Sequence, residues 1–169
     1  MTAETRGSTA RISLRPAEEN DIGIIHEFIQ ELADFERLSH EVVATEALLQ
    51  QFLFGERPVA EAIIAEYEGT PAGFALFFYT FSTFLARPGL YLEDLFVKPD
   101  LRGKGIGKAL LRYVSDLAVE RDCGRVEWSV LDWNQSAIQF YEKLGAAPMA
   151  EWTVYRLAGS ALRDFTQKR

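Results

Sequence analysis

The sequence contains little with which to close a disulfide or bind a metal. Its 169 residues include one cysteine and two histidines. A single thiol cannot form an intrachain disulfide or a cysteine-based zinc site, so we interpret Cys123 as an inert thiol and expect no metal. No run reaches the ~20 apolar residues of a membrane helix, and residues 1–10 lack the apolar core of a signal peptide. We therefore expect a cytoplasmic protein that does not enter a membrane.

Positive charge is outnumbered overall but concentrated in one place. The formal net charge is −7, from 18 basic and 25 acidic side chains. Residues 98–112 nevertheless hold five basic residues and one acidic residue, a local charge of +4, so the rest of the chain carries −11. An acidic protein is a poor generic ligand for nucleic acid, whereas a local basic loop can hold a phosphorylated small molecule. We expect no nucleic-acid partner.

Apolar residues recur with helix and strand periods along most of the chain, and they make up 48% of it. This composition favours one α/β domain over residues 11–169, after a flexible tail at residues 1–10. Period-two alternation predicts strands, and apolar residues three and four positions apart predict helices. In chain order the expected elements are a strand at 11–17, a helix at 19–36, a short helix at 46–53, strands at 60–67, 72–81 and 90–97, a helix at 106–121, a strand at 125–131, a helix at 135–144 and a strand at 149–158. The strands within 60–81 should form an antiparallel hairpin and the passage 90–131 a parallel crossover, which gives a mixed, mostly antiparallel sheet flanked by helices.

The loop "RGKGIGK", residues 102–108, joins an apolar strand to a helix. The first amides of a helix have no partner within the helix, and the positive end of the helix dipole lies behind them. The glycines lack Cβ atoms, so an anion can approach the backbone, and the lysines add positive charge. These features predict a binding site for a pyrophosphate group.

Other phosphate-binding loops space their glycines differently. A P-loop ends in Gly-Lys-Ser/Thr, whereas Gly107 and Lys108 precede Ala109. A dinucleotide fingerprint follows the first strand of a domain, whereas this loop follows roughly the fourth and has a glycine at every second position. A plain solvated turn stays open as the simplest alternative.

The loop and its flanks resemble the acetyl-CoA signature, R/Q-x-x-G-x-G/A, of the GNAT superfamily of N-acetyltransferases. The matching stretch runs from Arg102 to Gly107, directly after "LFVKPDL" and at the start of a helix. The resemblance implies that the loop amides bind the pyrophosphate of coenzyme A and that the preceding strand pairs with its pantetheine arm. The residues so implied are Leu95, Phe96, Val97, Arg102, Gly103, Lys104, Gly105, Ile106, Gly107 and Lys108, with Asn134, Gln135, Ser136 and Ala137 from the next helix.

Four segments, in order, narrow the resemblance to the diamine (spermidine/spermine) acetyltransferase family. They are "ELADFERLSHEV", "LYLEDLFV", "RGKGIG" and "VLDWNQSAIQFYEKLGA". The stretches "VLDWNQ" and "FSTF" are similar to its thialysine acetyltransferase branch. The resemblance spans residues 11–157 and implies a single GNAT domain, acetyl-CoA as cosubstrate and a homodimer.

Acetyl transfer to an amine requires a base and an acid. An alkylammonium with a pKa near ~10 must lose a proton before it can attack, and a thiolate leaves more easily when it is protonated. The resemblance implies that Glu93 is the base, acting directly or through water, and that Tyr141 is the general acid. From the residues alone a core position is the favoured interpretation of Tyr141, since residues 137, 141 and 144 form an apolar helical face.

Glu93 and Asp94 stand together in an apolar strand, where unpaired charges are costly to bury. Successive strand residues face opposite sides, so both reach one cleft only if the strand is distorted. The family implies a bulge here, with Asp94 helping to bind a cationic substrate. An exposed edge pair that resists aggregation is the alternative. Further substrate-binding residues implied by the resemblance are Phe35, Glu36, Glu127, Trp128 and Ser129.

The expected substrate is a small cationic amine. Ser82 and Phe84 stand where a polyamine-acetylating relative has an acid and a tryptophan, and Thr153 and Tyr155 replace a late acid and an aromatic residue. Fewer anionic anchors favour thialysine, lysine or a small diamine over spermidine or spermine, with Glu36 expected at the distal amine. Polyamine acetylation, acetylation of a protein lysine or N-terminus, and a non-catalytic acetyl-CoA sensor stay open as alternatives.

Overall fold

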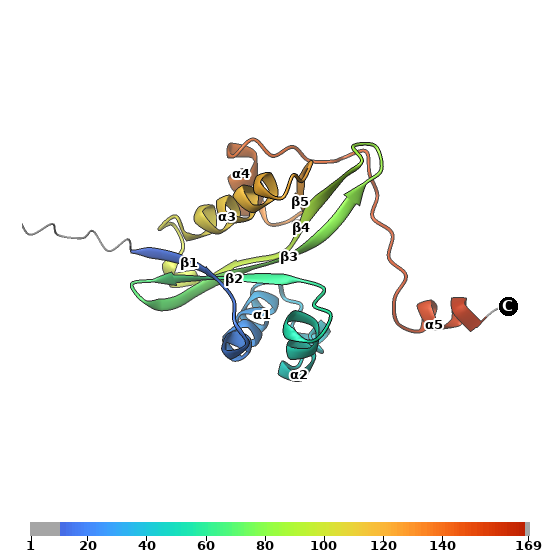
Figure 1. Ribbon diagram of the computed structural model, residues 1–169, viewed down its shortest axis with the longest axis horizontal. Helices are drawn as coiled ribbons and strands as arrows, with labels where there is room; N and C mark the ends of the chain where they lie inside the picture. The colour runs from blue at the N-terminus through green and yellow to red at the C-terminus, as the bar shows by residue number, and fades with distance from the viewer. Residues whose placement is uncertain (1–10, 168–169) are drawn as a thin grey trace, which may run out of the picture. The chain divides into compact units, whose positions relative to one another are not determined.

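The computed structural model describes residues 11–167 and contains a five-stranded sheet, with α1 on one face and α3 on the other (Figure 1). The strands are β1 (Ile12–Pro16), β2 (Glu61–Tyr67), β3 (Thr70–Ser82), β4 (Arg87–Val97) and β5 (Val126–Trp128). The helices are α1 (Ile22–Glu36), α2 (Glu46–Leu49), α3 (Ile106–Glu120), α4 (Gln135–Lys143) and α5 (Gly159–Gln167), and a π-helical turn at Gln50–Phe54 continues α2. The tail expected at residues 1–10 lies outside the described residues.

The strands lie in chain order across the sheet. β1 to β4 pair antiparallel with their neighbours, and β5 pairs parallel with β4. The predicted hairpin of β2 and β3 and the predicted crossover from β4 through α3 to β5 are both confirmed. The sheet is therefore mixed and mostly antiparallel, as expected, and its one parallel pair flanks the strand that leads into the glycine loop.

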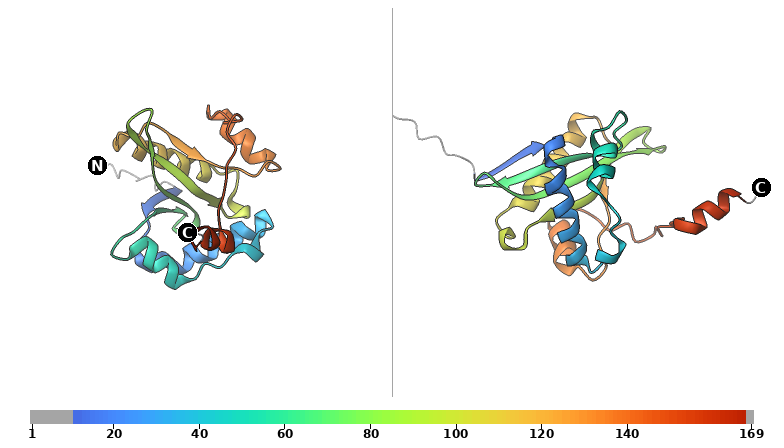
Figure 2. Two further views of the ribbon diagram at one scale, coloured as in Figure 1. Left: turned by 90° about the vertical axis from the view of Figure 1, so that its right-hand side faces the viewer. Right: turned by 90° about the horizontal axis from the view of Figure 1, so that it is seen from below.

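The sheet lies between α1 and α3 (Figure 2), and buried apolar side chains pack on both of its faces. On one face, the ring centroid of Phe28 lies 5.7 Å from those of both Phe74 and Phe96. On the other face, α3 packs on β3 and β4, and its buried residues recur at every fourth position from Ile106 to Val114. Each buried side chain of this size contributes about 1.5–3 kcal/mol. These layers fix the position of β4 between the two helices.

The chain divides after Ser129 into two compact units, and the second unit contains α4 and α5. α4 begins as predicted, because Asn134 accepts a hydrogen bond from the Ala137 N–H at 3.2 Å. It ends as predicted too, because Gly145 follows it with a φ of 89°, a left-handed conformation that favours glycine.

The strand predicted at residues 149–158 is wrong, because the structure has no strand there. The apolar side chains that suggested it are exposed, at 72% for Trp152, 83% for Val154 and 92% for Tyr155. A strand requires hydrogen bonds from a neighbouring strand, and no strand within residues 11–167 pairs with this segment. The following helix, α5, was not predicted, and its only signal was Leu162 and Phe165 three positions apart.

Candidate active site

β4 contains one extra residue where the two predicted acids stand. Leu92 lies opposite Phe77 of β3 but Asp94 lies opposite Leu76, so Glu93 has no partner in the register. This is a β-bulge, which confirms the distortion expected here. Because cross-strand partners share a face, Leu92 takes the face of Phe77, and Asp94 takes the opposite face with Leu76. Leu76 belongs to the core packed against α1, so the bulge turns Asp94 toward the α1 side of the sheet.

The charges of Glu93 and Glu36 act on Asp94 at this bulge, and we call these three carboxylates the acidic cluster. Burial, together with the charges of Glu93 and Glu36, raises the pKa of Asp94 from its ordinary value of 3.8 to about 6. Burial also raises the pKa of Glu36, at the end of α1. No hydrogen bond or ion pair joins the three side chains to any other residue of the described chain. Uncompensated negative charge of this kind favours a cationic ligand.

Beyond the bulge, one edge of β4 is open. β5 pairs only with three residues of β4, all before the bulge. The Lys98 N–H donates to the Ala72 carbonyl of β3 at 2.9 Å. Because backbone groups alternate in direction along an antiparallel pair, Phe96 also turns its groups to β3, while Leu95 and Val97 turn theirs to the open edge. An extended ligand can therefore pair with Leu95 and Val97, whereas Phe96 is buried at 2% exposure with its backbone groups facing the sheet.

The glycine loop presents six successive backbone N–H groups, from Gly103 to Lys108. Gly103 and Gly105 have φ angles of 77° and 89°, and Gly105 directly precedes α3. The first helical hydrogen bond runs from the Ala109 N–H to the Gly105 carbonyl at 3.0 Å. None of the six earlier N–H groups donates to another described residue, and the helix dipole adds positive charge there. This geometry suits an anion such as a phosphate.

Basic side chains of the loop lie against aromatic rings. The Arg102 guanidinium lies 4.4 Å from the ring centroid of Phe35, and the Lys104 ammonium lies 4.7 Å from that of Tyr67. Arg102 also donates from Nε to the Val97 carbonyl at 3.0 Å. Arg102 thus links the glycine loop, the end of β4 and the end of α1. The structure in this way brings the predicted phosphate-binding residues close to predicted substrate-binding ones.

The sheet face that carries Asp94 continues across β4 to β5. Phe78 lies two residues from Leu76 in β3, so both share that face. Tyr91 of β4 lies opposite Phe78 on one side and opposite Glu127 of β5 on the other. Cross-strand partners share a face, so Tyr91 and Glu127 lie on the same side of the sheet as the acidic cluster.

Polar contacts connect the residues at this end of the face. The Tyr91 and Ser129 hydroxyls form a hydrogen bond of 2.6 Å. Glu127 forms an ion pair with Arg125, with 2.7 Å between Oε2 and Nε. Trp128, also predicted to bind substrate, is placed differently, because its alternation puts it on the opposite face of the sheet. Arg125 was missed from the sequence, where nothing distinguishes it from other surface arginines.

The remaining predicted residues lie in the second unit. The Asn134 side-chain oxygen caps α4 and also accepts a hydrogen bond from the Ser136 hydroxyl at 3.1 Å. The Gln135 amide donates to the Asp132 carbonyl at 2.9 Å. Tyr141 is half-buried on α4, and its ring centroid lies 5.3 Å from that of Phe140. These contacts define the start of α4, where the side chains expected at the pantetheine arm are found.

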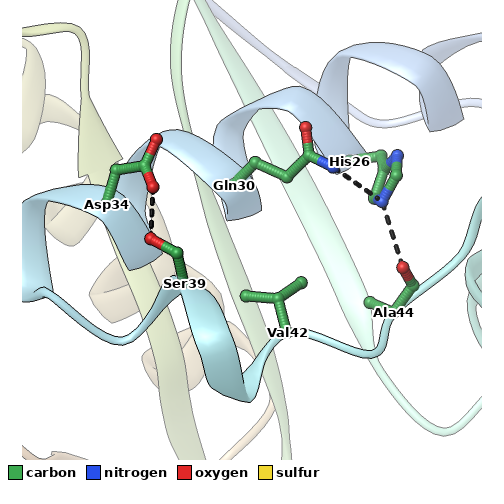
Figure 3. Close-up of a pocket in the computed structure, with 6 residues that line it drawn as sticks. All are labelled: His26, Gln30, Asp34, Ser39, Val42 and Ala44. Carbon is green, nitrogen blue, oxygen red and sulfur yellow. Dashed lines mark hydrogen bonds between the residues drawn. The ribbon is translucent and has the colours of Figure 1, made fainter.

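A separate pocket of about 330 Å³ lies between α1 and the segment after it (Figure 3). Its lining residues are His26, Gln30, Asp34, Ser39, Val42 and Ala44. His26 Nε2 donates to the Ala44 carbonyl at 3.1 Å in one tautomer or accepts from the Gln30 amide at 3.4 Å in the other, and the Ser39 hydroxyl donates to Asp34. These bonds fasten residues 39–44 to α1. No predicted site residue lines the pocket, and we assign it a structural role.

Within residues 11–167 no group of three His, Cys, Asp or Glu side chains is placed to hold a metal ion. Burial raises the pKa of the Cys123 thiol, which lowers its thiolate fraction. No helix in the same range is long and apolar enough to cross a bilayer.

Known proteins are similar to this chain in sequence and in fold. The profile of the Acetyltransferase (GNAT) family matches residues 25–146. A thialysine N-epsilon-acetyltransferase from Bos taurus is 36% identical over 170 residues, covering 94% of this chain and 99% of its own. An L-ornithine N5-acetyltransferase from Arabidopsis thaliana is 36% identical over 195 residues, covering 89% and 86%. The solved structure of an integron cassette protein from the mobile metagenome of V. cholerae superposes with a TM-score of 0.79 at 26% identity, covering 94% of this chain and 99% of that one.

Proposed function

The chain belongs to the acetyltransferase (GNAT) family of acetyl-CoA-dependent N-acetyltransferases, and we propose that its substrate is a small cationic amine such as thialysine, lysine, ornithine or a diamine. The observation that carries the proposal is the acidic cluster, whose charges have no cationic partner among residues 11–167. An ammonium group supplies the missing positive charge, and its deprotonated form is the nucleophile that acetyl transfer needs.

The glycine loop and the open edge of β4 suit acetyl-CoA. The unpaired N–H groups from Gly103 to Lys108 would bind its pyrophosphate, and Lys108 is exposed beside them. The backbone groups of Leu95 and Val97 would pair with its pantetheine arm. Further contacts to that arm are proposed for Asn134, Gln135, Ser136 and Ala137. When bound, acetyl-CoA supplies an acetyl group activated as a thioester.

In this proposal one side chain binds the substrate ammonium and two others transfer protons. Asp94, the less exposed acid of the bulge, holds the substrate ammonium by its charge. Glu93 is exposed, so it can take the ammonium proton, directly or through a water molecule, and release it to solvent. Tyr141 donates its phenolic proton to the departing thiolate. The resemblance also leads us to propose that the active protein is a homodimer.

Mass spectrometry of products tests this proposal. The protein is incubated with acetyl-CoA and equal concentrations of thialysine, lysine, ornithine, putrescine, spermidine and a lysine-containing peptide, with heat-inactivated protein as the control. The proposal predicts singly acetylated amino acids or diamine as the main products. Product from spermidine alone would indicate a polyamine acetyltransferase, product from the peptide alone a protein acetyltransferase, and no product a sensor of acetyl-CoA.

A further inference from the structure

An ion pair lies on the same sheet face as the acidic cluster, at its β5 end. Arg125 Nε is 2.7 Å from Glu127 Oε2, and the side chains are 41% and 37% exposed. Arg125 makes no hydrogen bond from its terminal nitrogens to another residue of the described chain. The pair therefore offers solvent two free N–H₂ groups on one side and a carboxylate oxygen on the other.

The backbone beneath the ion pair keeps Arg125 in place. A Cβ atom at Gly89 would lie 3.2 Å from Arg125 Cγ and 2.8 Å from Thr80 Oγ1, so glycine leaves room there for the arginine stem. The stem is thus packed over β4 while the guanidinium stays half-exposed. An arginine with a packed stem and one side fixed by a carboxylate loses less side-chain entropy when it binds a second carboxylate.

The distance from this ion pair to the acidic cluster matches the length of a diamino acid. Glu127 is the register neighbour of Tyr91, and Asp94 lies three residues further along β4. Because Glu93 is an extra residue, this stretch of β4 covers only two register steps of β3, from Phe78 to Leu76, or about 7 Å. The terminal nitrogen and α-carbon of an extended lysine are about 6 Å apart. The Tyr91 ring, whose centroid lies 5.3 Å from that of Phe78 on the same face, can flank the methylene groups.

We infer that Arg125 and Glu127 bind the α-amino-acid end of the substrate while its terminal amine lies at the acidic cluster. Arg125 pairs with the α-carboxylate through its free nitrogens, and Glu127 pairs with the α-ammonium. This inference rests on the proposed function and narrows the substrate class. A diamine of the same length has no carboxylate, so it leaves Arg125 unpaired and binds less tightly.

Arg37 is a second cation that could bind the substrate α-carboxylate, because it directly follows Glu36 of the acidic cluster. It is exposed, and it has a φ of 62° at the end of α1. No described residue pairs with its side chain, so nothing orients its guanidinium. This makes Arg37→Gln a control matched in chemistry and charge to Arg125→Gln.

The experiment compares lysine with cadaverine, its decarboxylated form, by steady-state thiol release at saturating acetyl-CoA. In Arg125→Gln, the KM for lysine should rise about tenfold or more with kcat nearly unchanged, since a charge-assisted contact is lost. Both constants for cadaverine should stay within about twofold, which also shows that the variant folds. Arg37→Gln should leave the preference for lysine intact.

Three results with the variants overturn the inference. They are an equal loss with both substrates in Arg125→Gln, no change with either, and a loss of lysine preference in Arg37→Gln instead. The failure of the proposed function looks different, because the wild-type protein then acetylates neither substrate. A wild type that uses cadaverine as well as lysine overturns the inference alone and leaves amine acetylation in place.

Discussion

The Asp94→Asn variant should be more stable than the wild type at neutral pH, although it removes a residue of the candidate active site. The pKa of Asp94 is raised from 3.8 to about 6, so the folded protein holds this proton more tightly than the unfolded chain does. Stability from this group is therefore present below about pH 4 and is lost as pH rises toward 6. The shift of about two pKa units corresponds to about 3 kcal/mol, and partial exposure of the side chain reduces this to about 1–3 kcal/mol.

Urea unfolding at two pH values measures this effect. At pH 7.5 the unfolding free energy of Asp94→Asn should exceed that of the wild type by about 1–3 kcal/mol, and at pH 4 the two should agree within about 1 kcal/mol. Asp116→Asn is the matched control, because Asp116 is 72% exposed on α3 and should show no pH-dependent gain. A variant that is equally stable or less stable than the wild type at pH 7.5 would refute the claim that Asp94 is an uncompensated charge.

Three further predictions concern activity. The kcat/KM for lysine should fall below about pH 6, because Asp94 must be ionised to hold the ammonium, and a profile that stays flat to pH 5 contradicts this. Gly105→Ala should raise the KM for acetyl-CoA about tenfold, since a left-handed alanine costs about 1–2 kcal/mol and relief of that strain would shift the N–H groups proposed to bind the pyrophosphate. An unchanged KM would count against the phosphate site. Tyr141→Phe should lower kcat about 100-fold with the KM for acetyl-CoA retained, and an unaltered kcat removes Tyr141 from its assigned role.

The glycine loop and the helix caps could be predicted from the sequence because each depends on interactions between residues close to one another in the chain. The glycine loop needs only the spacing of its glycines and a following helix, and the structure has both. The side chain of Thr45 accepts from the Leu48 N–H at 3.3 Å, so the cap expected for the short second helix is also confirmed. Both features depend on residues within a few positions of one another.

Features that depend on distant strands could not be predicted in the same way. Strand alternation alone puts Leu92 and Asp94 on one face, and only the pairing of β4 with β3 shows that Glu93 is an extra residue that separates them. Resemblance, and not the residues, suggested this bulge. The packing of the Arg125 stem likewise depends on Gly89, which is 36 positions earlier in the chain. The prediction of a strand at 149–158 was wrong for the same reason, because alternation within a segment does not show whether another strand lies beside it.

The central claim is that the acidic cluster at the β4 bulge receives the amine to be acetylated. The most direct test is the ratio of kcat/KM for lysine between Asp94→Asn and the wild type at pH 7.5 and saturating acetyl-CoA. Loss of a charged partner for the ammonium costs about 3 kcal/mol, so the kcat/KM of the variant should be about 100-fold lower than that of the wild type. A ratio within threefold of one, in a variant that folds, would contradict the claim.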